Sequence, residues 1–65
     1  MTELMKEVIY TMGNIGGYAT IEEIKEKHNE IFIREANLDE IYYACLDLVI
    51  KKEIENDKMH YFWIK

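Results

Sequence analysis

The sequence predicts an α+β fold in which three helices are followed by a C-terminal β-hairpin. The clearest evidence lies in the second half of the chain, where apolar residues recur at helical spacing over residues 38–51. Two short extended segments, 53–56 and 59–64, follow this helix and flank an Asn-Asp-Lys turn. A length of 65 residues is enough for one domain, spanning residues 1–65, and too short for two.

The first predicted helix covers residues 2–12 and leads into a short strand at 18–19. Its apolar stripe consists of Leu4, Met5, Val8, Ile9 and Met12. Its opposite, solvent-facing side consists of Lys6, Glu7, Tyr10 and Thr11. Gly13 stands where the end of a helix often adopts a left-handed conformation. We interpret Gly16 and Gly17 as a connection, because no Lys-Ser/Thr pair follows them as a phosphate-binding loop would require.

The starts of the second and third helices are marked by capping boxes. Thr20–Glu23 is a clear one, and the helix that it begins is predicted to end near residue 29. Asn37–Glu40 is a weaker one at the start of the third helix. The segment 30–36 between them is longer than the turn of a plain helix-turn-helix. We interpret its apolar run, 31–33, as a plug over the mouth of the core, with a strand as the alternative.

The third predicted helix has an apolar side and a polar side. Its apolar arc of about 160° consists of Leu38, Ile41, Tyr42, Cys45, Leu46, Leu48 and Val49. The remaining arc consists of Asp39, Glu40, Tyr43, Ala44, Asp47, Ile50 and Lys51. We therefore expect Tyr42 in the core. We also expect Cys45 to be buried and unreactive, because a free cysteine behaves as a small apolar side chain.

The two faces of the predicted hairpin carry different residues. Because side chains alternate along a strand, Phe62 and Ile64 share one face. Met59, Tyr61 and Trp63 share the other. Either face can cover the core of so small a domain, and the sequence leaves this choice open. If the second face is exposed, its Tyr and Trp are residue types that the centres of protein interfaces favour.

The order of these elements resembles the winged-helix superfamily over nearly the whole chain. The residues that carry the resemblance are Gly17-Tyr18-Ala19-Thr20, the long third helix and the terminal Tyr61-Phe62-Trp63-Ile64. In that superfamily the third helix usually enters the major groove of DNA and the hairpin contacts the backbone. The resemblance implies that the ligand would be faced by Asp39, Glu40, Tyr43, Asp47, Lys51, Asn56, Asp57 and Lys58.

The charge of the chain disfavours a nucleic-acid ligand. The formal net charge is −5. Residues 1–36 carry four basic and seven acidic side chains, and residues 37–65 carry four and six, so neither part is a basic module. A negative field of this kind repels phosphates, whose neutralisation by Lys and Arg supplies most non-specific affinity for nucleic acids.

The residues that could support catalysis or metal binding are few. Cys45, His28 and His60 are the soft metal ligands, and no two of them have the spacing of a metal site. The sequence contains no Ser, and its carboxylates lie on predicted helix surfaces, where nothing separates their pKa values for acid–base work. A chain of this size is also too small for a deep cleft. We therefore predict no enzymatic activity, no metal and no cofactor.

The sequence thus favours a small acidic module that binds a protein partner. It would act as a regulator or inhibitor in transcription or other nucleic-acid machinery, including a virus-encoded one. The predicted protein-binding residues are Asp39, Glu40, Tyr43, Asp47, Tyr61 and Trp63. The alternative is a DNA-binding transcriptional regulator that contacts phosphates through Lys51, Lys52 and Lys58.

Three further features predict a cytoplasmic protein without membrane association. A single Cys cannot form an internal disulfide, which fits a reducing compartment. The first residues have neither the basic start nor the apolar run of a signal peptide. No apolar stretch approaches the ~20 residues that a membrane-spanning helix needs. The sequence leaves open whether the protein is a monomer or a homodimer.

Overall fold

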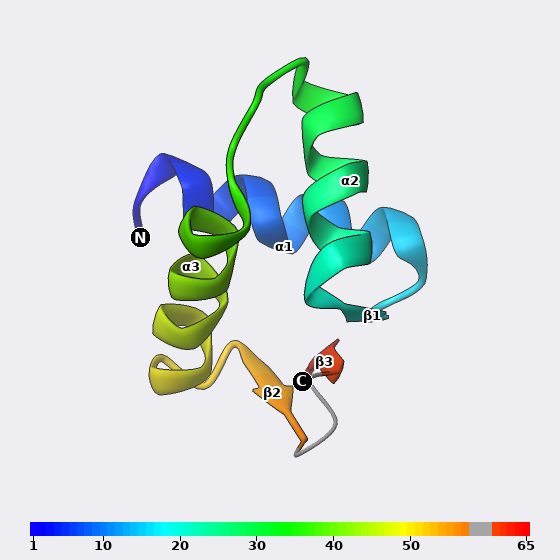
Figure 1. The fold of residues 1–65 in the computed structure, drawn as a ribbon. Coiled ribbons are helices and arrows are strands. Elements are labelled where there is room, and N and C mark those ends of the chain that lie inside the picture. The colour runs from blue at the N-terminus through cyan, green and yellow to red at the C-terminus, as the bar shows by residue number, and fades with distance from the viewer. Residues whose placement is uncertain (58–60) are drawn as a thin grey trace.

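The computed structural model describes residues 1–57 and 61–65, and in these residues the chain forms three helices and a small antiparallel sheet (Figure 1). The elements are α1 (Glu3–Ile15), β1 (Tyr18–Thr20), α2 (Ile21–Phe32), α3 (Leu38–Ile50), β2 (Ile54–Asn56) and β3 (Tyr61–Ile64). The predicted α+β fold with a C-terminal hairpin is therefore confirmed. The arrangement is also compatible with a winged-helix-like domain.

Helix α1 is longer than predicted, because it continues through Gly13 to Ile15. Its left-handed C-terminal residue is Gly16, with φ of 115°, and the Gly16 N–H donates to the Met12 carbonyl at 3.2 Å. A glycine inside a helix costs about 1 kcal/mol relative to Ala, an amount that tertiary packing can offset. The last turn of α1 has such packing, since Ile15 lies against the core.

Helix α2 begins at the predicted capping box, in which both bonds between Thr20 and Glu23 are present. The predicted plug at 31–33 is wrong. Ile31 and Phe32 belong to the last turn of α2, and Ile33 is 90% exposed in a left-handed conformation with φ of 51°. The helix extends this far because the Phe32 ring packs on the helical residues around it, 5.1 Å from the His28 ring and 5.9 Å from the Tyr10 ring.

Helix α3 also begins at its predicted capping box, formed by Asn37 and Glu40. Its buried residues are Ile41, Ala44, Cys45 and Leu48. Tyr42, predicted in the core, is 37% exposed, and Ala44, predicted on the free side, is buried. The helix is thus turned relative to the predicted arc. The small Ala44 side chain allows close packing, whereas exposure of Tyr42 keeps a phenol hydroxyl in water.

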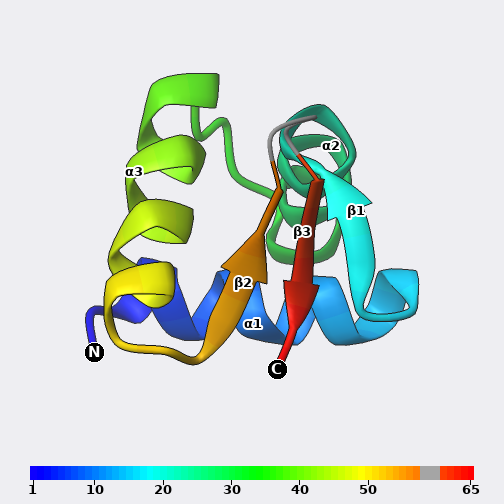
Figure 2. The ribbon, with the colours of Figure 1, turned by 90° about the horizontal axis from the view of Figure 1, so that it is seen from below.

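The three strands pair in the order β1-β3-β2, with both pairs antiparallel. Phe62 on β3 lies opposite Ala19 on β1, and these two residues and Ile54 of β2 are buried. Helices α1 and α2 lie on this inner side of the sheet (Figures 1 and 2). The hairpin face of Phe62 therefore covers the core, although Ile64 is 40% exposed. Met59 lies outside the described residues.

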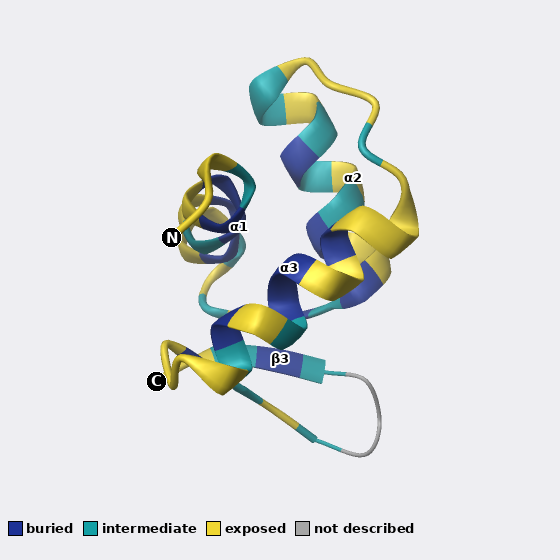
Figure 3. Cartoon of the chain, turned by 90° about the vertical axis from the view of Figure 1, so that its left-hand side faces the viewer, coloured by how far each residue is buried: buried dark blue, intermediate teal, exposed yellow. Residues whose placement is uncertain are grey.

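The core lies between the three helices and the inner face of the sheet. Figure 3 shows the buried residues on the sides of the helices that face one another and on β3. The buried apolar side chains are Met5, Val8, Met12, Ala19, Ile21, Ile24, Ile41, Ala44, Cys45, Leu48, Ile54 and Phe62. Three polar residues, Glu7, Thr11 and His28, are buried with them.

Candidate functional site

The outer face of the sheet carries a cluster of three aromatic residues, which we call the aromatic face: Tyr18 of β1 and Tyr61 and Trp63 of β3. The Tyr18 and Tyr61 rings are stacked, with centroids 4.8 Å apart and planes at 13°. The Tyr18 and Trp63 rings lie 6.0 Å apart at 29°. In Figure 2 the sheet is seen from this side, and no helix of the described chain covers it. Tyr18 is 54% exposed, and the other two side chains are half-buried.

Charged residues border the aromatic face. Glu55 lies opposite Trp63 in the β2–β3 register, and its Oε2 accepts the indole N–H at 3.1 Å. The other oxygen of Glu55 lies 3.5 Å from the Lys65 ammonium. Asp57 accepts the backbone N–H of Tyr61 at 3.0 Å. Although Tyr18 is largely exposed, partial desolvation raises its pKa, and the negative charge of Asp57 raises it further.

The free side of α3 carries the predicted acidic residues. Asp39, Glu40 and Asp47 are exposed, and Tyr43 is 63% exposed, with its ring 5.7 Å from that of Tyr42. Glu40 has a structural role as well, because its carboxylate accepts the Asn37 N–H at 3.0 Å in the capping box. This side of α3 is therefore acidic and partly aromatic, as the sequence predicts.

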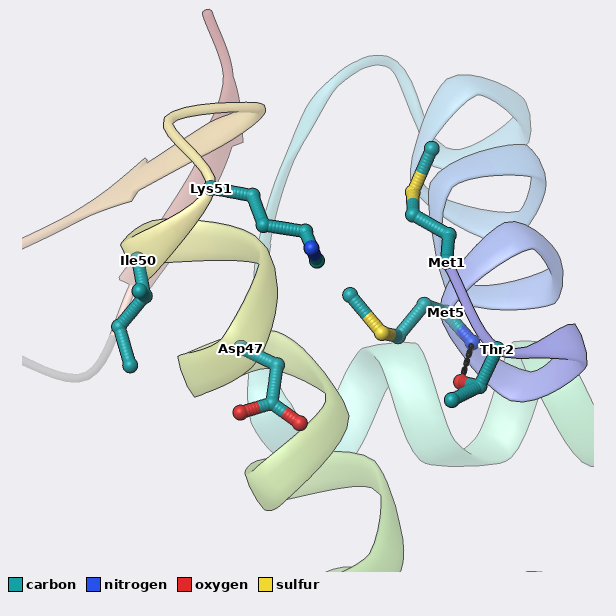
Figure 4. Close-up of a pocket in the computed structure, with 6 residues that line it drawn as sticks. All are labelled: Met1, Thr2, Met5, Asp47, Ile50 and Lys51. Carbon is teal, nitrogen blue, oxygen red and sulfur yellow. Dashed lines mark hydrogen bonds between the residues drawn. The ribbon is translucent and has the colours of Figure 1, made fainter.

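An open hollow of about 470 Å³ lies between the end of α3 and the start of α1 (Figure 4). The hollow is lined by Met1, Thr2, Met5, Asp47, Ile50 and Lys51. Figure 4 shows the Met5 and Lys51 side chains reaching into the space between the two helices, whereas Ile50 points away. Asp47 and Lys51 are four residues apart on one helix face, and no ion pair joins them in the described chain. Three of the six lining residues are apolar, and the described lining holds no catalytic set.

The structure groups only some of the predicted site residues. Tyr61 and Trp63 lie together on the aromatic face. Asp47 of α3 instead faces the start of α1. Among the described residues, no ring contact, hydrogen bond or ion pair joins Asp47 or Tyr43 to the aromatic face. Strand β2 contacts α3 and pairs with β3, and Figure 2 shows it between the two.

Two of the predicted cationic residues lie where α3 meets the hairpin. Lys51 and Lys52 are exposed, and Lys52 has a left-handed backbone with φ of 62°. Lys58 lies outside the described residues. Sequence reasoning missed Tyr18 and Glu55 as members of the site. Side chains alternate along a strand, so the predicted strand at 18–19 already placed Tyr18 and Ala19 on opposite faces. The neighbours of Tyr18 on β3 follow only from the strand pairing.

A buried polar cluster, which sequence reasoning also missed, joins α1 to α2. His28 Nε2 lies 2.7 Å from Glu7 Oε1, and Arg34 Nη2 lies 3.0 Å from Glu7 Oε2. His28 is fully buried, and its Nδ1 lies 3.0 Å from the Asn29 side-chain oxygen. Glu7 and Thr11, predicted on the solvent side, are thus buried. Both bond within the fold, since the Thr11 hydroxyl donates to the Glu7 carbonyl at 2.7 Å.

The polar groups of this cluster bond to one another and join α1 to α2. Each buried side-chain N and O atom of the described residues has a hydrogen-bond partner. No group of three His, Cys, Asp or Glu side chains in residues 1–57 and 61–65 is arranged to hold a metal ion. Cys45 is buried as predicted, and burial raises the pKa of its thiol to about 12.

Comparisons with protein-family models, with curated proteins and with solved structures find no match for this chain. Among the described helices, none has both the length and the apolar character that crossing a membrane requires.

Proposed function

We propose that this protein is a small acidic winged-helix module, without enzymatic activity, that binds a protein partner. It would serve as a regulator or inhibitor in transcription or other nucleic-acid machinery. The observation that carries the proposal is the aromatic face, where Tyr18, Tyr61 and Trp63 pack together on a side of the sheet that no described helix covers. Tyr and Trp are the residues most enriched at the centres of protein interfaces.

The charges around the aromatic face and on the exposed side of α3 support a protein partner over duplex DNA. In a winged helix that reads DNA, the third helix approaches the phosphates. Here the exposed side of α3 carries Asp39 and Asp47. Stacking of single-stranded bases on the aromatic face would need a basic groove beside the rings. The described charged residues that border the rings are Glu55, Asp57 and Lys65, two of them acidic.

DNA binding is the second candidate function, and it has one observation in its favour. Lys51 and Lys52 are exposed together at the end of α3, next to the hairpin. Two lysines supply few counterion-releasing contacts, so the first proposal predicts duplex DNA affinity no tighter than about 10⁻⁴ M at physiological salt. Tight, sequence-selective binding by the isolated protein would instead favour the DNA-binding function and contradict the first proposal.

Affinity capture from an extract of the source organism tests the protein-binding function directly. Tyr18→Ala and Asp47→Lys should each reduce capture of the same partner, the first through faster dissociation and the second through slower association at low salt. Glu26→Lys is the matched control, because it makes the same charge change at an exposed position of α2. The proposal is wrong if all three folded variants capture the partner as the wild-type protein does.

A further inference from the structure

The aromatic face combines ring faces with negative charge. Glu55 accepts the Trp63 N–H from the β2 side, and the charge of Asp57 acts on the Tyr18 hydroxyl from the turn side. The whole chain also carries a formal net charge of −5. Aromatic faces carry a negative quadrupole, which attracts a cation placed above the ring.

We propose that the aromatic face binds the arginine or lysine side chains of a basic segment in the partner protein. This inference rests on the proposed function and specifies the chemistry of the partner. In the Tyr18–Tyr61 stack each ring turns one face toward the other, so a guanidinium group would stack on an outer ring face of the cluster. Glu55 supplies a carboxylate at the rim of the same surface for a charge-assisted hydrogen bond.

The protein already places one of its own cations at this rim. The Lys65 ammonium lies 3.5 Å from Glu55 Oε1, while the other carboxylate oxygen holds the Trp63 indole. Both side chains are about half exposed, at 51% for Lys65 and 46% for Glu55, so this ion pair is weak and can exchange partners. Lys65 thus occupies the position that an incoming arginine or lysine would take, and it competes with that ligand.

A strand of nucleic acid is the ligand that competes most directly with this inference. Its bases could stack on the same three rings. Its phosphates would then come close to Glu55 and Asp57, which repel them. A basic peptide would be attracted instead. The apolar stems of its Arg and Lys side chains can pack on the rings, and their charged ends can interact with the carboxylates.

Trp63 gives a direct measurement, because it is the only Trp in the sequence. Its emission can be followed while the protein is titrated with a short peptide in which Arg alternates with Ser. Parallel titrations use the same peptide with Lys, Gln, norleucine or Glu in place of Arg, and a single-stranded oligonucleotide. The Arg and Lys peptides should change the Trp63 emission and bind about tenfold or more tightly than the Gln and norleucine peptides. Their affinity should fall as salt is added.

Two variants and a matched control locate the binding on the aromatic face. Tyr18→Ala should weaken the Arg peptide by about two- to fivefold, which is the range of one exposed cation–π contact. Lys65→Gln should strengthen it, since the competing cation is gone. Tyr10→Ala is the control for Tyr18→Ala, because Tyr10 has a similar exposure, 59% against 54%, but lies on α1 beside Phe32.

The other outcomes overturn the inference. Equal affinity for the Arg, Gln and norleucine peptides would mean that apolar contact alone drives binding. Preference for the Glu peptide or the oligonucleotide would contradict the proposed cation recognition, as would no binding by any peptide. These results leave the proposed function standing if Tyr18→Ala still reduces partner capture from the extract. If capture is unaffected by Tyr18→Ala and Asp47→Lys, the proposed function itself fails.

Discussion

Removing the Glu7 carboxylate should destabilise this protein more than any surface change. Glu7 contacts two basic groups, fully buried His28 at 2.7 Å and Arg34 at 3.0 Å. Leaving a buried hydrogen-bonding group without its partner costs about 1–3 kcal/mol, and more when the lost partner is charged. We expect about 3 kcal/mol for Glu7→Ala, because fully buried His28 loses its 2.7 Å contact and Arg34 loses its carboxylate as well. Domains of this length have a total stability of only about 3–10 kcal/mol.

Two further variants separate the buried contact from the exposed one. The Arg34 side chain is 53% exposed, so Arg34→Ala should cost about 0–1 kcal/mol, as surface ion pairs do. Replacing both buried partners with apolar residues, Glu7→Met with His28→Leu, should recover most of the stability that Glu7→Ala loses. Urea unfolding followed by circular dichroism measures all of these free energies. If Glu7→Ala costs no more than Arg34→Ala, the buried pair contributes nothing beyond a surface contact.

Two other predictions concern single positions in the helices. Gly16 and Ile33 both have a left-handed backbone, so Gly16→Ala should destabilise and Ile33→Gly should stabilise the protein, each by about 1–2 kcal/mol in urea unfolding. A change of the same sign in both variants would contradict this. The Cys45 thiol, with its pKa raised to about 12, should react slowly with thiol reagents in the native protein and rapidly in denaturant. Cys45→Ser should cost about 1–3 kcal/mol, because it buries a hydroxyl that has no arranged partner.

Local sequence patterns predict correctly where α2 and α3 begin and that a hairpin follows α3. Both capping boxes, at Thr20–Glu23 and Asn37–Glu40, form with the predicted bonds. The hairpin pairs antiparallel, with Ile54 opposite Ile64. These features depend on bonds between residues only a few positions apart, so the residues that specify them are adjacent in the sequence. The exposure of Asp39, Tyr43 and Asp47 follows from helical periodicity in the same way.

Contacts between segments that are distant in the sequence fix which side of each element is buried and which residues form the aromatic face. Glu7 looks like a solvent-facing residue in its own helix, and its contacts with His28, 21 positions later, and with Arg34 make its burial favourable. Tyr18 belongs to the site only because β1 pairs with β3, which brings it beside Tyr61 and Trp63. Contacts of this kind join residues that are distant along the chain. These contacts stabilise the protein only when the whole fold has formed, so local sequence patterns do not predict them.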